Sequence, residues 1–335
     1  MGLDEIAGRD RLAIVGVAKN CGKTTTLNVL MRRRRELGLA PPALVSIGID
    51  GEAKDVLLGT EKPPVVVAEG QWVATAEGAI GQSTARFEYI HATGFRTPLG
   101  EIMVGRAVDE GTILLAGLRH RAEVKAVVDL MAERGPGAVW IDGAYGRVAG
   151  AHPELTEAVV VSTGAVAGPD IGAVAERTAD LVSRLTIPAV EDGDHRRALE
   201  HAVDEGCLYV VLCDGSVEPL GSESAVVALA GARSDWSDVE AVAVCGLVSD
   251  RVLEELLTIQ PAGHLLVPDG TVIHAGAGLW RRFRRSWKIW ALSTSAVVGL
   301  GFNPTCVTGR TVDADGLRAA LEEGCPQIPV FNPLQ

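Results

Sequence analysis

A short run of residues near the N-terminus has the composition of a loop that holds phosphate groups. Residues 16–25 read Gly-Val-Ala-Lys-Asn-Cys-Gly-Lys-Thr-Thr and directly follow the apolar run Leu12–Val15. A strand that feeds such a loop, which then opens a helix, directs backbone N–H groups at an anion. We expect Lys23 to reach the β- and γ-phosphate oxygens and the Thr24 hydroxyl to bind Mg²⁺. The motif therefore predicts a site for a nucleoside triphosphate.

The spacing of this motif departs from the usual one by a single residue. The usual loop has four residues between its first glycine and Gly-Lys-Thr, and here that position is Val17, with the glycine one residue earlier at Gly16. A chance Gly-Lys-Thr in a turn is the alternative, but strand, loop and helix all fall where the motif needs them. The residues predicted to contact the nucleotide are Gly16, Lys19, Asn20, Cys21, Gly22, Lys23, Thr24 and Thr25.

Three of these loop residues have a second interpretation. Lys19 either stabilises phosphate charge or is an exposed loop lysine, and the loop position favours the first. Asn20 either donates to a phosphate oxygen or tolerates a left-handed turn. Cys21 either blocks the site when it is oxidised or is simply a small side chain that fits a tight turn, and we favour the small side chain.

Two aspartates follow apolar runs that are expected to be strands. Asp142 ends the run 138–142 and resembles the Walker B aspartate, although it could instead cap a turn before Gly143. Asp50 ends the run 43–49 and could contact Mg²⁺ or orient water, or could simply begin an Asp-Gly turn. Ligands of open α/β sheets bind outside the carboxyl ends of the strands. The predicted catalytic residues are Lys23, Asp50 and Asp142, and the predicted metal ligands are Thr24, Asp50 and Asp142.

The elements that must position these residues alternate between strand and helix. This alternation predicts an α/β fold of the P-loop NTPase type with a mostly parallel sheet. Helices are expected at 24–37, 121–134, 170–185, 249–258, 279–290 and 314–323, and further strands at 157–162, 208–213, 241–247 and 296–301. Residues 64–117 read as an antiparallel β insertion. The predicted domains are 1–187, which binds nucleotide, and 188–335, a C-terminal α/β domain that binds a partner or substrate.

Three further segments are interpreted mainly in structural terms, and two of them also have a functional alternative. Arg32–Arg35 is expected to be a solvated helix end that interacts with the helix dipole. The segment 280–290 is rich in Trp and Arg and reads as an amphipathic helix with Trp280, Phe283 and Trp287 in the core, or as a docking helix for an acidic protein. Ser162–Ala165 either lines the nucleotide cleft or forms a loop before a helix, and we favour the loop.

Composition narrows the class of protein. The chain has 335 residues, 47% of them hydrophobic, and a formal net charge of −12, which disfavours nucleic acid as a partner. Its six cysteines form no C-x-x-C motif and no zinc-spaced pair, so they read as reduced cytosolic thiols. No signal peptide and no membrane-length apolar run is visible, so we expect a cytoplasmic protein that does not bind membranes. The absence of Asn-Lys-x-Asp favours adenine, and therefore ATP, over guanine.

Several motifs together make the chain similar to a particular family. They are the residues from Gly16 to Asn28, Ser46-Ile-Gly-Ile-Asp-Gly-Glu52, Glu69-Gly-x-Trp-Val-Ala-Thr-Ala76, Ile141-Asp-Gly-Ala-Tyr-Gly-Arg147 and Ser162-Thr-Gly-Ala165. The pattern resembles the P-loop subunit of the lysine 5,6-aminomutase reactivase. The resemblance covers about the first half of the chain and weakens beyond residue 190.

This resemblance implies an ATP-driven chaperone for an adenosylcobalamin-dependent aminomutase. Nucleotide binding or hydrolysis would open the complex so that damaged cobalamin leaves and fresh cofactor enters, with a second reactivase subunit as a further expected partner. The chain lacks Asp-x-His-x-x-Gly, the signature of one class of cobalamin-binding domain, so the aminomutase is expected to hold the cobalamin.

Two other classes of protein remain open from the sequence. The first is a dethiobiotin-synthetase-like enzyme that transfers a phosphoryl group from ATP to a small carboxylate, which predicts a basic pocket near the loop. The second is a nucleotide-gated metal or cofactor chaperone. That class ranks last because no ligand cluster is visible in the sequence.

Overall fold

The computed structural model describes residues 2–48, 64–143, 148–191, 193–221, 224–231 and 233–335. Two compact units emerge from it. The first combines residues 1–179 with 296–335, and the second comprises residues 180–295. Helix α5 (Ile171–Leu185) runs across the division, and the chain returns to the first unit for its last segment. This division departs from the expected break at residue 187, because strand β17 (Val297–Asn303) pairs with a strand of the first unit.

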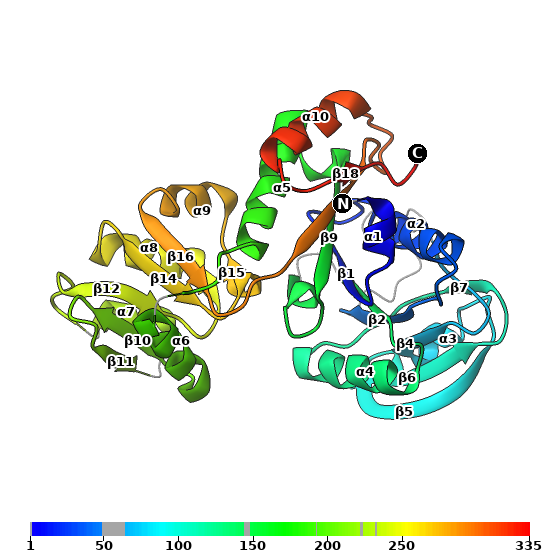
Figure 1. Ribbon diagram of the computed structural model, residues 1–335, viewed down its shortest axis with the longest axis horizontal. Coiled ribbons are helices and arrows are strands. Elements are labelled where there is room, and N and C mark those ends of the chain that lie inside the picture. Colours follow the sequence, from blue (N-terminus) through cyan, green and yellow to red (C-terminus); the bar gives the residue numbers. More distant parts are fainter. Residues whose placement is uncertain (1, 49–63, 144–147, 192, 222–223, 232) are drawn as a thin grey trace. The chain divides into compact units, whose positions relative to one another are not determined.

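The first unit contains a nine-stranded sheet with the order β18-β17-β9-β1-β8-β2-β4-β6-β5 (Figure 1). Its seven strands from β18 to β4 pair in parallel, and β6 and β5 extend one edge in antiparallel fashion. The bounds are β1 Arg11–Gly16, β2 Ala43–Ile47, β4 Trp72–Ala76, β5 Phe87–Thr97, β6 Gly100–Ala107, β8 Val139–Gly143, β9 Ala158–Gly164 and β18 Val330–Phe331. The α/β class with a mostly parallel sheet is therefore confirmed.

Helices cover both faces of this sheet because its central strands alternate their side chains between two cores. In β1, Leu12 and Ile14 pack with α2 (Lys23–Glu36) and α1 (Leu3–Ala7), whereas Ala13 faces the side of α4 (Arg121–Arg134). Strand β8 divides in the same way, with Trp140 in the first core. A strand buried on both faces must read as a continuous apolar run, as these strands do.

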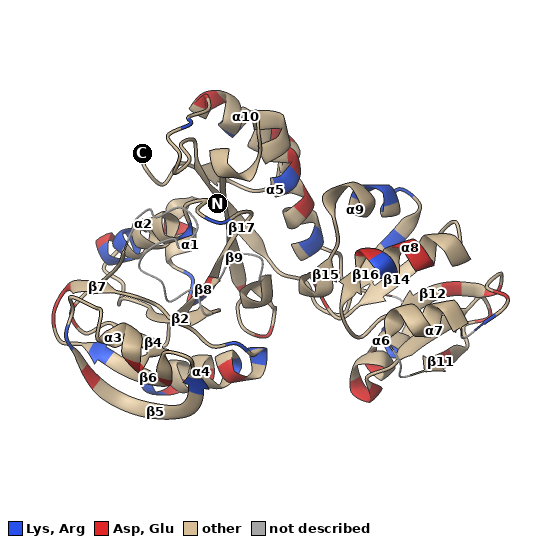
Figure 2. Cartoon of the chain, turned by 180° about the vertical axis from the view of Figure 1, so that it is seen from behind, with Lys and Arg blue, Asp and Glu red and all other residues tan. Residues whose placement is uncertain are grey.

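The arginine-rich end of α2 is not fully solvated, in contrast to the expectation for Arg32–Arg35. Figure 2 shows basic residues along this helix, but Arg34 is only 5% exposed. Its guanidinium donates to the carbonyls of Ala7, Arg9 and Ala40 and lies 5.8 Å from the ring centre of Trp140. The Arg34 guanidinium therefore satisfies three buried or half-buried backbone carbonyls, which lie at the ends of helices and strands.

The β-rich segment 64–117 is only partly the antiparallel insertion that its pattern predicted. Strands β5 and β6 form an antiparallel hairpin, and β3 (Val65–Val67) pairs antiparallel with β7 (Gly111–Ile113). Strand β4, however, pairs in parallel with β2 and continues the main sheet. The segment also contains the short helix α3 (Glu77–Ile80). Local composition indicated strands correctly but could not show which strand each would join.

The second unit has its own five-stranded sheet in the order β11-β10-β12-β14-β16 (Figure 1). Its strands are β10 Leu208–Leu212, β11 Val217–Gly221, β12 Val239–Ala243, β14 Gly263–Val267 and β16 Trp287–Ala291. Helix α6 (Gly193–Glu205) packs on one face of this sheet, and α7 (Ala225–Gly231), α8 (Asp250–Ile259) and α9 (Ala277–Phe283) pack on the other. Strands β13 (Val248–Ser249) and β15 (Ile273–His274) form a small parallel pair.

The expected helix over 279–290 is wrong beyond residue 283. Helix α9 ends at Phe283, and Trp287 begins strand β16. Trp280, Phe283 and Trp287 are nevertheless all buried, and the rings of Phe283 and Trp287 stack at 5.2 Å. The prediction that these aromatic residues belong to the core is confirmed, and they are therefore unavailable as anchors for a docking helix.

The remaining helix predictions for the first unit agree closely with the structure, since α2 and α4 lie where their patterns place them and α10 spans Ala314–Gly324. Short 3₁₀ segments occur at Val148–Ala151, Ala165–Ala167 and Gly270–Val272. Within the described ranges, none of the helices combines the length and apolar character needed to cross a bilayer.

Candidate functional site

The sequence-predicted site lies where the carboxyl ends of four parallel strands of the first unit meet. Strand β1 runs between β8 and β9, and β17 lies beyond β9. Gly16 at the end of β1 pairs with Ser162 of β9, which in turn pairs with Gly301 of β17. On the other side, Ile14 of β1 pairs with Asp142 of β8. The sheet order therefore brings these segments to one edge, where open α/β sheets bind ligands.

The loop between β1 and α2 folds back tightly on itself. A Cβ atom added at Gly16 would lie 2.7 Å from the Cys21 Sγ and 3.0 Å from the Lys23 Cδ, which leaves little room for a side chain. Asn20 and Gly22 have left-handed backbone angles, with φ of 61° and 96°. Left-handed residues are typical of turns whose successive N–H groups line a concavity that binds anions. The loop therefore accommodates its one additional residue between Gly16 and Gly22 by folding tightly on itself.

Helix α2 presents its N-terminus to this loop without a side-chain cap. Gly22 is the N-cap residue and makes no side-chain hydrogen bond, because glycine has no side chain. The first N–H groups of an α-helix have no partners inside the helix, and the helix dipole makes this end positive. Lys23, Thr24 and Thr25 occupy the first turn and are half-buried. The local charge is therefore positive and suited to an anion.

The other predicted residues divide into those near this loop and those that cannot be placed. Asp142 is half-buried on β8, where its partners across the neighbouring strands are Ile14 and Ser46. Lys19 and Asn20 are half-buried within the loop itself. Asp50 lies outside the described residues, so its predicted role in catalysis and metal binding stays a prediction.

Strand β9 contributes to the site more directly than its interpretation as a helix-entry loop suggested. The Ser162 carbonyl accepts a hydrogen bond from the Val17 N–H at 2.9 Å, and its hydroxyl donates to Thr26 of α2 at 3.2 Å. Ser162 and Thr26 are both buried. Ser162 therefore fixes both ends of the loop relative to the sheet.

Sequence reasoning missed a second segment at this edge, the loop that follows β17. Asn303 ends β17, and its Cβ lies 3.5 Å from the position of a Cβ added at Gly22. Arg310 further along donates to the carbonyls of Ala165, Gly168 and Pro169, which join this loop to the one after β9. The one signal in the sequence was the polar Asn-Pro-Thr that follows an apolar strand.

The loop after β17 also contains a thiol with a perturbed environment. Cys306 makes a 2.8 Å hydrogen bond with the hydroxyl of Thr308, and this contact lowers the pKa of the thiol. The side chain is only 7% exposed, so its access to solvent is small. The Cys306–Thr308 contact lies within the turn 305–311, whose ends are also joined by a hydrogen bond between the hydroxyls of Thr305 and Thr311.

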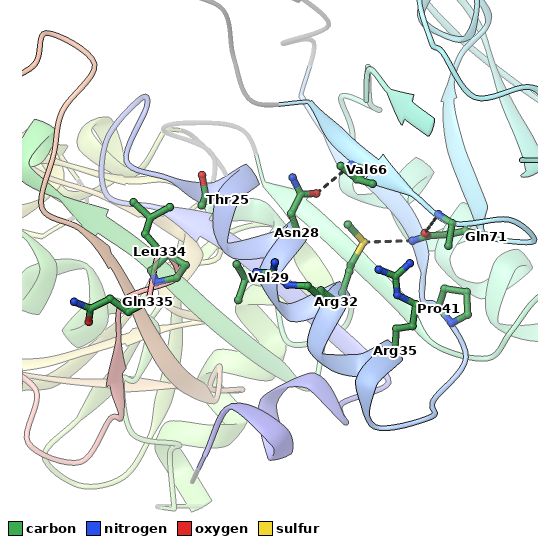
Figure 3. A pocket seen from close by; sticks show the side chains of 13 residues that line it. Thr25, Asn28, Val29, Arg32, Arg35, Pro41, Val66, Gln71, Leu334 and Gln335 are labelled. Carbon is green, nitrogen blue, oxygen red and sulfur yellow. Dashed lines mark hydrogen bonds between the residues drawn. The ribbon is translucent and has the colours of Figure 1, made fainter. Parts of the chain in front are cut away.

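A cavity of about 660 Å³ lies along α2 and reaches its N-terminal turn (Figure 3). Its walls come from α2, β3 and the C-terminal segment, and its lining includes Thr25, Asn28, Arg32, Arg35 and Gln335. The Asn28 side chain accepts from the Val66 N–H at 3.1 Å, which fixes that wall. The cavity therefore combines the start of the helix with two guanidinium groups.

The fold and the site together define an α/β protein with a large, mostly parallel mixed sheet and a glycine-containing strand–loop–helix segment at its carboxyl edge. In comparisons with known proteins, the chain matches no protein-family model and no curated protein.

Proposed function

We propose that this protein binds and hydrolyses a nucleoside triphosphate, ATP in preference to GTP, at the loop between β1 and α2. The observation that carries the proposal is the combination of a closed loop, an uncapped helix N-terminus and Lys23 in its first turn. Each of these favours a polyphosphate, and together they supply backbone donors and one mobile cation. Asp142 on the neighbouring strand adds a carboxylate at the same edge.

The proposed roles follow from the chemistry of the side chains. Lys23 contacts the β- and γ-phosphate oxygens, and Lys19 adds a second positive charge to the same loop. Thr24 and Asp142 supply the oxygen donors that Mg²⁺ prefers, so they would hold the ion. When bound, Mg²⁺ would neutralise charge that develops on the phosphate oxygens. The hydroxyl and carboxylate fit this hard cation, whereas a site of thiols or imidazoles would not.

We further propose that nucleotide turnover serves the reactivation of an adenosylcobalamin-dependent aminomutase. This finer proposal is supported by the sequence resemblance, which includes the loop, the strand ending in Asp142 and Ser162–Ala165. In this role the first unit binds nucleotide and the second unit, residues 180–295, engages the aminomutase or a second reactivase subunit.

The test measures ATP binding and ATP hydrolysis by wild type and Lys23→Ala, with and without an aminomutase that has been inactivated by turnover. Lys125→Ala is a matched control, because Lys125 is an exposed lysine on α4 that pairs with Asp129. We expect stimulation by the aminomutase in wild type and in Lys125→Ala, and none in Lys23→Ala. Binding of ATP that is equal in all three proteins would refute the nucleotide site. Lys23-dependent binding without stimulation would refute the reactivase role alone.

A second candidate is an enzyme that transfers a phosphoryl group to a small carboxylate, as a dethiobiotin-synthetase-like protein does. The cavity along α2 favours it, since Arg32 and Arg35 can pair with a carboxylate and Thr25 lies at its other end. This function predicts that ATP is converted to ADP, with transfer of the γ-phosphoryl group to the carboxylate, only when a small carboxylate is present and without any added protein. It also predicts that Arg32→Ala raises the KM for that carboxylate and leaves ATP affinity unchanged.

A further inference from the structure

The second unit brings together three side chains that no sequence motif connects. His195 on α6, Glu240 on β12 and His264 on β14 offer nitrogen and oxygen atoms that all lie within 4.8 Å of one another. The His195 Nε2 is 3.4 Å from the Glu240 Oε1, and the two imidazole rings meet edge to face at 5.0 Å. Three different elements therefore converge on one point.

A β-bulge is what turns Glu240 toward the two histidines. Val211 of β10 pairs with Ala241, but the next residue, Leu212, pairs with Val239, so Glu240 is the extra residue of β12. A bulge makes two successive side chains share a face that regular alternation would divide between them. Ala241 packs in the core beneath α6, and Glu240 reaches His195 on that same helix. Bulges of this kind are common beside functional sites because they re-aim a side chain.

The register of the sheet supplies the third residue. His264 lies directly opposite Ala241 in the parallel pairing of β12 with β14. Its ring also approaches that of Trp290 on β16, at 6.3 Å between ring centres, which forms an apolar wall on that side. His195 is only 5% exposed, whereas the Glu240 side chain is 46% exposed. The cluster is therefore walled by protein on one side and open to solvent at the carboxylate.

We propose that His195, Glu240 and His264 form a binding site for a divalent transition-metal ion of the zinc class. Two imidazoles and one carboxylate are a ligand set that such ions accept, with at least one coordination position left for water or another ligand. Ligand atoms around a tetrahedral zinc ion lie about 3.3–3.5 Å apart, given metal–ligand distances of about 2.0–2.2 Å. The His195–Glu240 separation already has this value. The three ligand atoms lie within 4.8 Å of one another, so the most distant two must move about 1 Å closer together to bind one ion. Rotation of the side chains supplies this movement.

The alternative is an ordinary ion pair between a histidine and a glutamate, and the same helix offers an example. His201 on α6 lies 3.7 Å from Glu205, one turn away, with both side chains about half exposed. Among the residues that the structure describes, His201 and Glu205 do not belong to a group of three potential metal ligands. It is therefore a matched control that has the same helix, the same residue types and a similar separation, but lacks the third ligand.

The experiment is a titration of the full-length protein, stripped with a chelator, with Zn²⁺ in the presence of excess Mg²⁺. Binding is followed by calorimetry and by metal analysis after dialysis. We expect one Zn²⁺ per chain in wild type, with affinity at least about tenfold weaker in Glu240→Gln and His264→Ala. His201→Ala should bind as wild type does. Because Glu240 is exposed, Glu240→Gln should retain the fold, which circular dichroism checks. Substitution with Co²⁺ gives an independent readout, since the intensity of its visible spectrum reports the coordination number.

Three outcomes would overturn this site. They are the absence of saturable Zn²⁺ binding, unchanged affinity in Glu240→Gln and His264→Ala, and an equal loss in His201→Ala, which would indicate surface chelation. Displacement of Zn²⁺ by Mg²⁺ would overturn the zinc class. The site goes beyond the proposed nucleotide chemistry and is tested separately from it. Lys23→Ala should keep its Zn²⁺ whether or not it hydrolyses ATP.

Discussion

Replacement of Arg34 by alanine tests how the candidate nucleotide segment is held against the sheet. The guanidinium donates to three carbonyls, those of Ala7, Arg9 and Ala40, at 2.7 to 3.0 Å. It therefore links the end of α2 to the turn that precedes β1. The alanine variant removes all of these donors, so the three carbonyls can then bond only to water or to other nearby groups.

The magnitude follows from the environment of each contact. A hydrogen bond from a charged donor contributes about 1.5–3 kcal/mol, but exposed carbonyls recover part of this from water. The fourth partner, Asp10, has a side chain that is 71% exposed, so its ion pair adds little. Lost packing over Trp140 adds about 0.5–1 kcal/mol. We expect Arg34→Ala to destabilise the first unit by about 3 to 5 kcal/mol.

The assay is urea unfolding followed by circular dichroism and by tryptophan fluorescence. With a denaturant dependence of about 3 kcal/mol per molar, the midpoint for the first unit should fall by about 1 to 2 M. Arg35→Ala is the control, because Arg35 is 60% exposed and pairs with Glu110 only at 3.5 Å. It should cost less than about 0.5 kcal/mol. Equal urea midpoints for the two variants would refute the reasoning, because the hydrogen bonds of the buried Arg34 guanidinium would then contribute no more than a surface ion pair.

Three further predictions concern the site and the second unit. Gly16→Val should abolish ATP binding, measured by calorimetry, while the circular dichroism spectrum is kept, because its Cβ would meet the Cys21 sulfur at 2.7 Å; wild-type affinity would contradict the closed loop. Asp142→Asn should weaken Mg²⁺-dependent ATP hydrolysis by at least about tenfold and raise the Mg²⁺ concentration for half-maximal rate; an unchanged Mg²⁺ dependence would remove Asp142 from the metal site. A 2.7 Å hydrogen bond to Glu205 raises the pKa of Tyr209 to about 12. The stability from this bond is therefore present below the ordinary phenol pKa and is lost as pH rises through about 12. Absorbance titration of phenolate should show Tyr209 ionising at lower pH in Glu205→Gln, and an unshifted titration would count against the bond.

Much of the first unit could be predicted because its patterns are local. About 25 consecutive residues encode the strand that ends at Gly16, the loop and the helix that starts near Lys23. Helices α4 and α10 are likewise each encoded by a short local pattern. Burial on both faces gives the central strands their continuous apolar runs. The prediction of a helix over 279–290 was wrong because spaced aromatic residues indicate burial in either a helix or a strand. The prediction that Arg34 is solvated was wrong because the charge of a residue does not show whether it is buried.

The sequence by itself determined the strand–loop–helix segment, the alternation of helices and strands, and the positive charge at the start of α2. These depend on residues a few positions apart, whose spacing fixes local conformation and the face on which each side chain lies. Only the tertiary structure decided that the strands of Asp142, Ser162 and Asn303 lie side by side near the loop, that residues 296–335 return to the first unit, and that His195, Glu240 and His264 meet. Strand order and register depend on which distant strands pair, and backbone hydrogen bonds between strands are the same for nearly every sequence.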